Sequence, residues 1–450
     1  MNSIQQKAVE FVKKLTELDI TIGLSTFIES GYEMFREYFM ELASAKVEEV
    51  DENIAGNPSV RRGWTVQRKG DVRTLVTEHG ELKYTRRYYK NEKHRDYSYL
   101  ADRVIGVDKY ERIERGLGAK LCNMATEQSY AKSSDYLCKG MVSRQSVLNK
   151  TRDVREERLE PVEQRTDVEV LHIQADEDHV ALQDSRRSTI VKLVTIHEPV
   201  KFKGKRVYLP QRFSLVSYQE NVDDFWLRVA DEISKRYGDR DNLTVYIHGD
   251  GASWIRTGLE WIKNSRYVLD KYHLMKYMRP VCGKNETCYA HLWDALQSND
   301  YNRLRNLVEC MVNDGCCQEE TGKEFLDYAR KNWDGIRIWY EDLASGGSCT
   351  EGLVSHILSD RLSSRPKGWL DEGIETISRL RVYVCNGGTI KPDDVRKTRP
   401  ARGLTKQAMK KLQKKMSEFE PMPSELFTTP KRGTSLYRLF EGIKYGGMAI

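Results

Sequence analysis

The sequence predicts a mixed α/β protein built from several domains. Three observations support this class: apolar residues recur at helical spacing before residue 60, three β-branched apolar runs follow residue 167, and helical and strand-like segments then alternate. The chain has 450 residues, which is more than one ordinary hydrophobic core accommodates. Its apolar fraction of 39% is sufficient for packed cores.

The N-terminal part is predicted to be mainly helical with one β-hairpin. Residues 63–90 alternate between apolar and polar side chains, and His79-Gly80 separates two β-rich runs. Residues 98–152 return to a helical pattern. We expect the hairpin and the helices that follow it to form a DNA-binding region.

Within that region, one segment resembles a helix-turn-helix. A first helix is expected from Ala131 to Cys138, followed by a turn at Lys139-Gly140, and Ser143 is placed to cap a second helix. The second helix carries five side chains that can contact base edges or phosphates: Arg144, Gln145, Asn149, Lys150 and Arg152. The alternative is that this helix pair is only a scaffold.

Apolar, β-branched runs begin at Val168. Three strands are expected first, and a helix, a strand and a strand passing into a helix follow. In chain order these segments are residues 168–183, 188–199, 205–219, 221–238, 243–254 and 265–278. This succession is the element order of an RNase H-like sheet, which is a mixed α/β layer fold.

The patterns divide the chain into six expected regions. They are a helical N-terminal region (1–60), the hairpin and helix-turn-helix-like DNA-binding region (61–160), the first part of an RNase H-like catalytic core (165–275), an all-helical insertion (276–346), the last part of the core (347–386) and a basic C-terminal tail (387–450).

Two acids stand where predicted core strands end. Asp176 follows the apolar run VLHIQA, and Asp250 follows VYIHG between Gly249 and Gly251. Either Asp alone is more typical of a loop or helix cap, but two acids at the ends of core strands favour a shared site. Asp178 is the competitor of Asp176, because it falls on the same face of the strand.

A third acid, Glu351, begins a helix with an apolar stripe. Glu341 and Asp342 are its rivals, and Glu351 is also explained as a charge that complements the helix dipole. Three converging carboxylates are the ligands that two Mg²⁺ or Mn²⁺ ions need for phosphodiester chemistry. The expected metal ligands are Asp176, Asp250 and Glu351.

Three motifs in this part of the chain resemble one family. They are ADEDHVALQ from residue 175, GDGASWIRTGLEWI from residue 249 with VLDKYHLMKYM from residue 268, and TEGLVSHILSDRLSSRPKGW from residue 350. Together they resemble the ISLre-type bacterial insertion-sequence transposases and, more distantly, the Mutator-like and hAT transposases. The resemblance extends roughly from Trp64 to Trp369.

This resemblance implies a DNA transposase that binds the terminal inverted repeats of its element and catalyses metal-dependent cleavage and strand transfer. It implies an Asp, Asp, Glu triad, here Asp176, Asp250 and Glu351, with a helical insertion before the Glu. It also implies a [Cys/Asp]-x-x-His motif, matched by Asp270 and His273, so His273 is a candidate catalytic residue. The alternatives are an RNase H-like nuclease or resolvase, and a non-catalytic DNA-binding protein derived from a transposase.

Composition agrees with a nucleic-acid partner without requiring one. The net charge is only +6, but basic residues cluster, most densely from Arg396 to Lys415. Neither zinc-finger spacing nor a disulfide framework is evident among the nine cysteines. No signal peptide or membrane span is expected. We expect a cytoplasmic, nucleoid-associated homodimer or higher oligomer that binds double-stranded element ends and target DNA, with no membrane partner.

Overall fold

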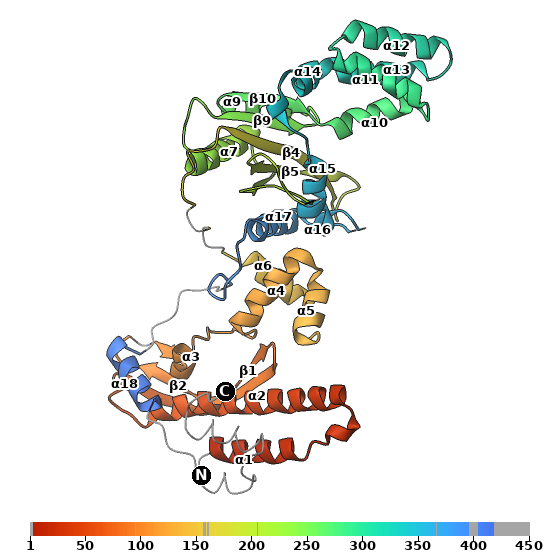
Figure 1. The fold of residues 1–450 in the computed structure, drawn as a ribbon. Helices are drawn as coiled ribbons and strands as arrows, with labels where there is room; N and C mark the ends of the chain where they lie inside the picture. The colour runs from red at the N-terminus through yellow and green to blue at the C-terminus, as the bar shows by residue number, and fades with distance from the viewer. Residues whose placement is uncertain are drawn as a thin grey trace. The chain divides into compact units, whose positions relative to one another are not determined.

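The structure is a computed structural model that describes residues 3–94, 96–155, 159, 162–204, 206–365, 367–395 and 404–417. The chain divides into two compact units. The first comprises Met1–Cys122, Ser129–Arg155 and Lys391–Ile450, and the second comprises Asn123–Gln128 and Glu156–Ile390. The elements of both units are labelled in Figure 1. The mixed α/β class expected from the sequence is confirmed.

The first unit is built on a three-stranded antiparallel sheet that packs against a long helix, α2 (Leu24–Ala55). The strands are β1 (Trp64–Thr77), β2 (Gly80–Asn91) and β3 (Tyr97–Ser98). β1 and β2 form the expected hairpin, in which Thr77 pairs with Gly80. The other helices that lie wholly or mainly in this unit are α1 (Ser3–Thr16), α3 (Leu100–Val104), α4 (Arg115–Glu127), α5 (Tyr130–Cys138), α6 (Arg144–Arg152) and α18 (Lys406–Met416).

Helix α18 lies in the basic segment 387–450, and it contributes to the core of the first unit. Ala408 and Leu412 are buried in one cluster with Ile54 of α2 and Trp64 of β1. Ala408 and Leu412 are four residues apart, so they lie on one apolar face of α18, and this face packs into the core. The lysines on the rest of the helix make the segment basic. Residues 396–403 and those after 417 lie outside the described residues.

The second unit contains a five-stranded mixed sheet in the order β10-β9-β4-β5-β8. Its strands are β4 (Val170–Ala181), β5 (Ser188–His197), β8 (Phe213–Tyr218), β9 (Thr244–Gly249) and β10 (Ser265–Leu269). β5 is antiparallel to both of its neighbours, whereas β9 runs parallel to β4 and β10 runs parallel to β9. The C-terminal ends of β9 and β10 therefore point to the same edge of the sheet.

The third expected strand, 205–219, differs from the structure. Only Phe213–Tyr218 joins the five-stranded sheet, whereas Arg206–Tyr208 forms a separate two-stranded ribbon with Lys201–Lys203. Pro210 has no N–H to donate to a ladder, and Gln211 takes a positive φ of 51°. These two residues interrupt the extended conformation between the ribbon and the sheet.

Helices cover the sheet and fill the interval between its last strand and Glu351. They are α7 (Val222–Tyr237), α8 (Ser253–Arg256), α9 (Gly258–Trp261), α10 (Lys271–Cys282), α11 (Glu286–Gln297), α12 (Tyr301–Asn313), α13 (Glu319–Lys331), α14 (Trp333–Glu341), α15 (Thr350–Val354), α16 (Asp360–Leu362) and α17 (Asp371–Cys385). Residues 276–346 contain helices and their connections and no strand. Between α15 and α16, residues Ser355–Ser359 form a π-helical turn.

The helices of the 276–346 segment share a hydrophobic core with the sheet. Phe325 of α13 and Trp339 of α14 are buried in the same cluster as Leu269 of β10 and Ile173 of β4. The indole Nε1 of Trp339 also donates to the carbonyl of Leu269 at 2.9 Å. In the described part of the chain, no helix is both long enough and apolar enough to cross a membrane.

The packing of α18 gives a test of the first unit. Leu412→Ala should lower the free energy of unfolding by about 2–5 kcal/mol, because it removes a buried side chain and leaves a cavity. The exposed neighbour Gln413→Ala should change it by less than about 0.5 kcal/mol. Urea denaturation of both variants measures the difference, and hydrogen exchange of residues 404–417 localises it. Equal stability of the two variants would show that α18 does not belong to this core.

Candidate active site

The sheet register of the second unit sets Asp176 and Asp250 beside one another. In the parallel ladder between β4 and β9, the last pair joins Gln174 to His248. Continuing that register by two residues on each strand brings Asp176 level with Asp250. The two carboxyl groups influence each other electrostatically, as expected for neighbours on adjacent strands.

Two glycines allow the chain to turn tightly at Asp250. A Cβ on Gly249 would lie 2.9 Å from the carbonyl oxygen of Ala175 on the neighbouring strand. Gly251 has a φ of +90°, and a Cβ there would lie 2.1 Å from the side-chain oxygen of Asn332. Both positions require glycine. The carboxylate of Asp250 accepts a hydrogen bond from the backbone N–H of Ala252 at 2.9 Å, which closes this turn.

A third strand end adds Asp270 and His273. Asp270 follows β10 and caps α10, accepting from the N–H of Tyr272 at 2.9 Å. Its other oxygen lies 3.2 Å from Nδ1 of His273. Burial raises the pKa of Asp270, but the hydrogen bonds to His273, Thr350 and Tyr272 outweigh burial and hold it below its usual value. Asp270 is therefore an ionised group that orients the His273 ring.

Glu351 reaches the same edge of the sheet from the first turn of α15. Two contacts hold that helix in place. The hydroxyl of Thr350 donates to Asp270 at 2.5 Å, and the backbone N–H of Cys349 donates to the side-chain oxygen of Gln174 at 3.1 Å. Gln174 lies on β4 two residues before Asp176, so strands β4 and β10 jointly position Glu351.

Asp176, His273 and Glu351 form one compact group. Each offers a ligand atom, and the three atoms lie within 4.8 Å of one another. Burial, together with the charges of Asp250 and Glu351, raises the pKa of Asp176 to about 7. Burial lowers the pKa of His273, but the hydrogen bond to Asp270 and the charges of Asp176 and Asp250 outweigh it and raise that pKa.

This group fits a divalent cation. Mutually repelling carboxylates gathered at one point lose that repulsion when a cation binds between them. Carboxylate oxygens are the ligands that Mg²⁺ and Mn²⁺ prefer. Asp250 borders the group without being one of its three members, so Asp176 and Glu351 are the central ligands. The carboxylate of Asp270 behind His273 is the arrangement that orients a histidine at a metal site.

The competing acids have other partners. Asp178 is buried and accepts hydrogen bonds from the hydroxyls of Ser359 and Ser363, at 3.1 and 2.7 Å. Ser359 belongs to the π-helical turn, which presents it to Asp178. Asp342 accepts from Tyr246 at 2.5 Å and pairs with Arg266. Glu341 pairs with Arg337 one helical turn earlier. None of these three acids belongs to the group around Asp176.

The sequence patterns did not point to Gln174, Thr350 or Tyr328 as parts of this site. Gln174 and Thr350 act through side-chain hydrogen bonds to residues far away in the sequence, which leave no local sequence signature. The Tyr328 hydroxyl, from helix α13, donates to the backbone carbonyl of Asp250 at 2.7 Å. The helical segment before Glu351 therefore contacts the site directly.

Other side chains near the site have structural roles. His248 is fully buried and lies 3.1 Å from His172, whereas His179 is exposed and lies 3.6 Å from Glu177. Trp339 is buried in the core, and the indole of Trp333 donates to Asn299 at 2.9 Å. Both tryptophans pack in or against the hydrophobic core of this unit.

In the first unit, α5 and α6 form the expected helix pair, and Ser143 caps α6 by accepting from the N–H of Ser146 at 3.1 Å. Arg144, Gln145 and Asn149 are exposed, and the amide of Gln145 donates to Asn149 at 3.1 Å.

Two members of the predicted DNA-contacting set are less accessible. Arg152 is half-buried. Lys150 is only 8% exposed, and its ammonium lies 3.8 Å from Glu111. The expectation that Lys150 binds a phosphate is corrected, because the residue faces the interior of its unit. Lys150 lies three residues after the fully buried Val147, so both side chains belong to the inner face of this short helix.

The second unit is thus a mixed α/β domain with a candidate metal site. Acids and a histidine from several of its elements come together beside the sheet. A family model described as "Uncharacterised protein family (UPF0236)" matches residues 20–399. The chain belongs to this family.

Curated relatives match between 79% and 98% of the chain. A UPF0236 protein of Caldanaerobacter subterraneus subsp. tengcongensis is 33% identical over 98% of this chain and 97% of its own length. Another from the same strain is 33% identical over 98% of each chain. A UPF0236 protein of Streptococcus gallolyticus is 22% identical over 79% of this chain and 81% of its own length. The Caldanaerobacter relatives occur as many paralogues in one genome, which is typical of mobile elements.

The site predicts pH-dependent metal binding. With a pKa of about 7, the Asp176 carboxyl is protonated below that pH, so binding of Mn²⁺ must displace the proton. Affinity should rise as pH increases from 6 to 8, and Asp176→Asn should weaken binding by more than about tenfold and reduce its pH dependence. Asp178→Asn, two residues along the same strand, should bind as the unchanged protein does.

Isothermal titration calorimetry of the full chain in two buffers of different ionisation enthalpy measures affinity and proton release together. Affinity that is flat with pH, or weakened equally by both variants, would contradict the assignment of Asp176 as a ligand.

Proposed function

We propose that the chain is a DNA transposase of the ISLre type. In this proposal it binds the terminal inverted repeats of an insertion sequence and catalyses metal-dependent DNA cleavage and strand transfer. The single observation that carries the proposal is the convergence of ligand atoms of Asp176, His273 and Glu351 within 4.8 Å, with Asp250 directly after the adjacent strand β9.

The arrangement of the sheet supports an RNase H-like catalytic core. Three successive strands form one antiparallel half, and two strands separated by helices add in parallel on the other side. This is the succession implied by the family resemblance, including helices between the second acid and Glu351. The number of paralogues in one genome agrees with an element that multiplies by transposition.

Metal ions supply the chemistry that the side chains lack. Two bound Mg²⁺ or Mn²⁺ ions would activate a water or 3′-hydroxyl as nucleophile and stabilise charge on the leaving oxygen. Asp176, Asp250 and Glu351 are the residues proposed to hold them. His273, whose pKa is raised by its hydrogen bond to Asp270 despite burial, is proposed to contact a phosphate oxygen of the DNA.

Exposed side chains of α6 are proposed to recognise the element ends. Gln145 and Asn149 are four residues apart on one exposed face, and amide side chains of this kind can pair with adenine edges in the major groove. Arg144 at the start of the helix is suited to a phosphate contact. Lys150 is left out of this set because it is buried.

The first test concerns catalysis. Asp176→Ala, Asp250→Ala and Glu351→Ala should each abolish cleavage of DNA that carries the element ends, while binding of the same DNA in chelator is retained, because each removes a metal ligand and no DNA-contacting cation. Asp178→Asn is the matched control and should cleave. Strand-transfer products in Mg²⁺ distinguish a transposase from a hydrolytic nuclease. Cleavage that persists in excess chelator would refute the metal-dependent mechanism.

The second test concerns recognition. Gln145→Ala or Asn149→Ala should weaken binding to element ends by about 1–3 kcal/mol and change binding to random duplex little. Arg144→Ala should weaken both and reduce the salt dependence of binding. Competition binding with the full chain measures both effects. If all three variants keep the preference for element ends, then the α5–α6 pair is a scaffold and recognition lies elsewhere.

A further inference from the structure

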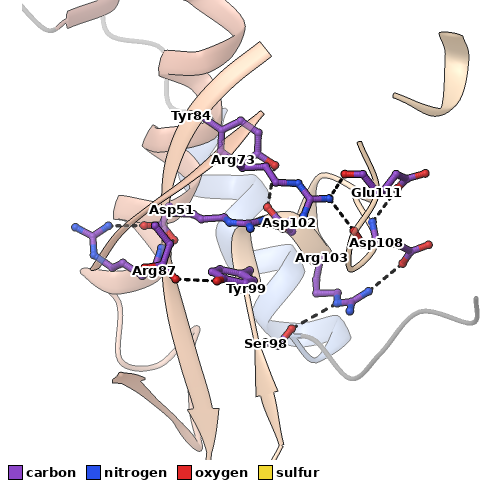
Figure 2. A network of polar contacts seen from close by, with 12 residues as sticks. Asp51, Arg73, Tyr84, Arg87, Ser98, Tyr99, Asp102, Arg103, Asp108 and Glu111 are labelled. Atoms are coloured by element: carbon purple, nitrogen blue, oxygen red, sulfur yellow. Dashed lines mark hydrogen bonds and ion pairs between the residues drawn. The ribbon is translucent and has the colours of Figure 1, made fainter. Parts of the chain in front are cut away.

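The first unit contains a cavity of about 310 Å³ between its sheet and the segment that follows β3. Its lining is basic and aromatic, with five Arg or Lys side chains and four tyrosines against one carboxylate, Asp102. Figure 2 shows the polar contacts around it, in which Arg73 reaches Asp108 and Glu111 and Arg103 reaches Ser98 and Asp108. The proposed catalytic chemistry uses none of these residues.

Arg86 is the buried cation of this cavity. It is 6% exposed and makes an ion pair with Asp102, whose other oxygen accepts from the Tyr84 hydroxyl at 2.8 Å. Its Nη1 is the atom that meets Asp102, whereas its Nε has no hydrogen-bond acceptor among the described residues. A buried guanidinium with an unused donor is costly unless a further acceptor arrives.

Arg73 increases the local excess of positive charge. One of its nitrogens donates to the backbone carbonyls of Asp108, at 2.9 Å, and Glu111, whereas its Nε has no acceptor among the described residues. The nearby carboxylate of Asp108 is already shared between Arg103 and Arg115, at 2.9 and 2.7 Å. Burial and the charge of Arg73 both lower the pKa of Arg86. An anion with several acceptor oxygens, such as a phosphate, satisfies both guanidinium groups.

A series of contacting aromatic rings extends from the Arg86 guanidinium to the surface. The guanidinium of Arg86 lies 3.6 Å from the ring centroid of Tyr99, and Tyr99 contacts Tyr88 with ring centroids 4.7 Å apart. Tyr88 stacks on Tyr97 at 5.6 Å with an interplanar angle of 14°. Tyr97 is 51% exposed. The series therefore ends in an accessible ring that can stack on a planar group.

We propose that this cavity binds one unpaired nucleotide of a DNA strand, with the phosphate at Arg86 and Arg73 and the base stacked on Tyr97. Choosing DNA as the ligand rests on the proposed function. A base inside a duplex has both faces covered by its neighbours, so only an unpaired or extruded nucleotide can offer a free face to Tyr97. The exposed Lys109 is then placed to contact a neighbouring phosphate of the same strand.

The test compares two DNAs of random sequence on the full chain in chelator, where cleavage does not occur. One is a blunt duplex, and the other is the same duplex with a three-nucleotide single-stranded overhang that contains 2-aminopurine. The overhang should bind roughly 5- to 150-fold more tightly, which is the range that stacking of one base on an aromatic side chain provides. The 2-aminopurine fluorescence should be quenched on binding.

Variants distinguish nucleotide binding in the cavity from DNA binding elsewhere on the protein. Tyr97→Ala should remove the preference for the overhang and leave binding of the blunt duplex unchanged. Tyr32→Ala replaces a tyrosine of similar exposure on α2 and should keep the preference. Arg86→Met should also remove the preference, and unchanged binding of the blunt duplex shows that this variant is folded. Lys109→Ala, at the exposed rim, tests the proposed phosphate contact without altering the buried pair of Arg86 and Asp102.

Three results would overturn the proposal. They are equal affinity of the unchanged protein for both DNAs, undiminished binding of an overhang that lacks its bases, and competition by a free nucleoside monophosphate as effective as competition by the overhang. The last result would assign the cavity to a free nucleotide. Because no cleavage is measured, failure here leaves the proposed function intact, and a protein that prefers the overhang but cleaves no element ends loses only the catalytic proposal.

Discussion

The parallel pairing of β4 with β9 is the constraint on which the second unit depends. It fixes where Asp176 lies relative to Asp250, because one ladder sets the register of both strands. The next parallel strand brings Asp270 to the same edge, where its N–H donates to the carbonyl of Gly249 at 2.8 Å. A shift of one residue in this register would turn Asp176 to the opposite face of the sheet and disperse the group.

Much of this site was predictable from local sequence, because an acid after a buried strand is a visible pattern. Asp250 and Asp270 directly follow β9 and β10, whereas Asp176 lies inside β4, just past the end of its ladder with β9, because β4 continues to Ala181. The tethers of Glu351 were not predictable, since Thr350 and Gln174 meet across the fold through spacing that only the tertiary structure defines. Lys150 was assigned wrongly because helical periodicity gives the faces of a helix but not which one packs inward.

The two units present opposite electrostatic problems. In the second, acids gathered around Asp176 repel one another, and a cation relieves that repulsion. In the first, Arg86 pairs with Asp102, the one carboxylate that lines the cavity, while Arg73 adds a second positive charge, and an anion relieves the excess. In both, neighbouring hydrogen bonds and aromatic contacts offset part of the free-energy cost of burying like charges together. The like charge that remains is characteristic of sites that bind a partner of opposite charge.

The close approach of Asn332 to Gly251 has a mechanical consequence. Asn332 lies where α13 meets α14, its side-chain oxygen also accepts from Arg256 at 3.1 Å, and Tyr328 one turn earlier holds the carbonyl of Asp250. Helices α13 and α14 therefore contact the loop that carries Asp250, a proposed metal ligand. A displacement of α13 and α14 would therefore also displace the loop that carries Asp250.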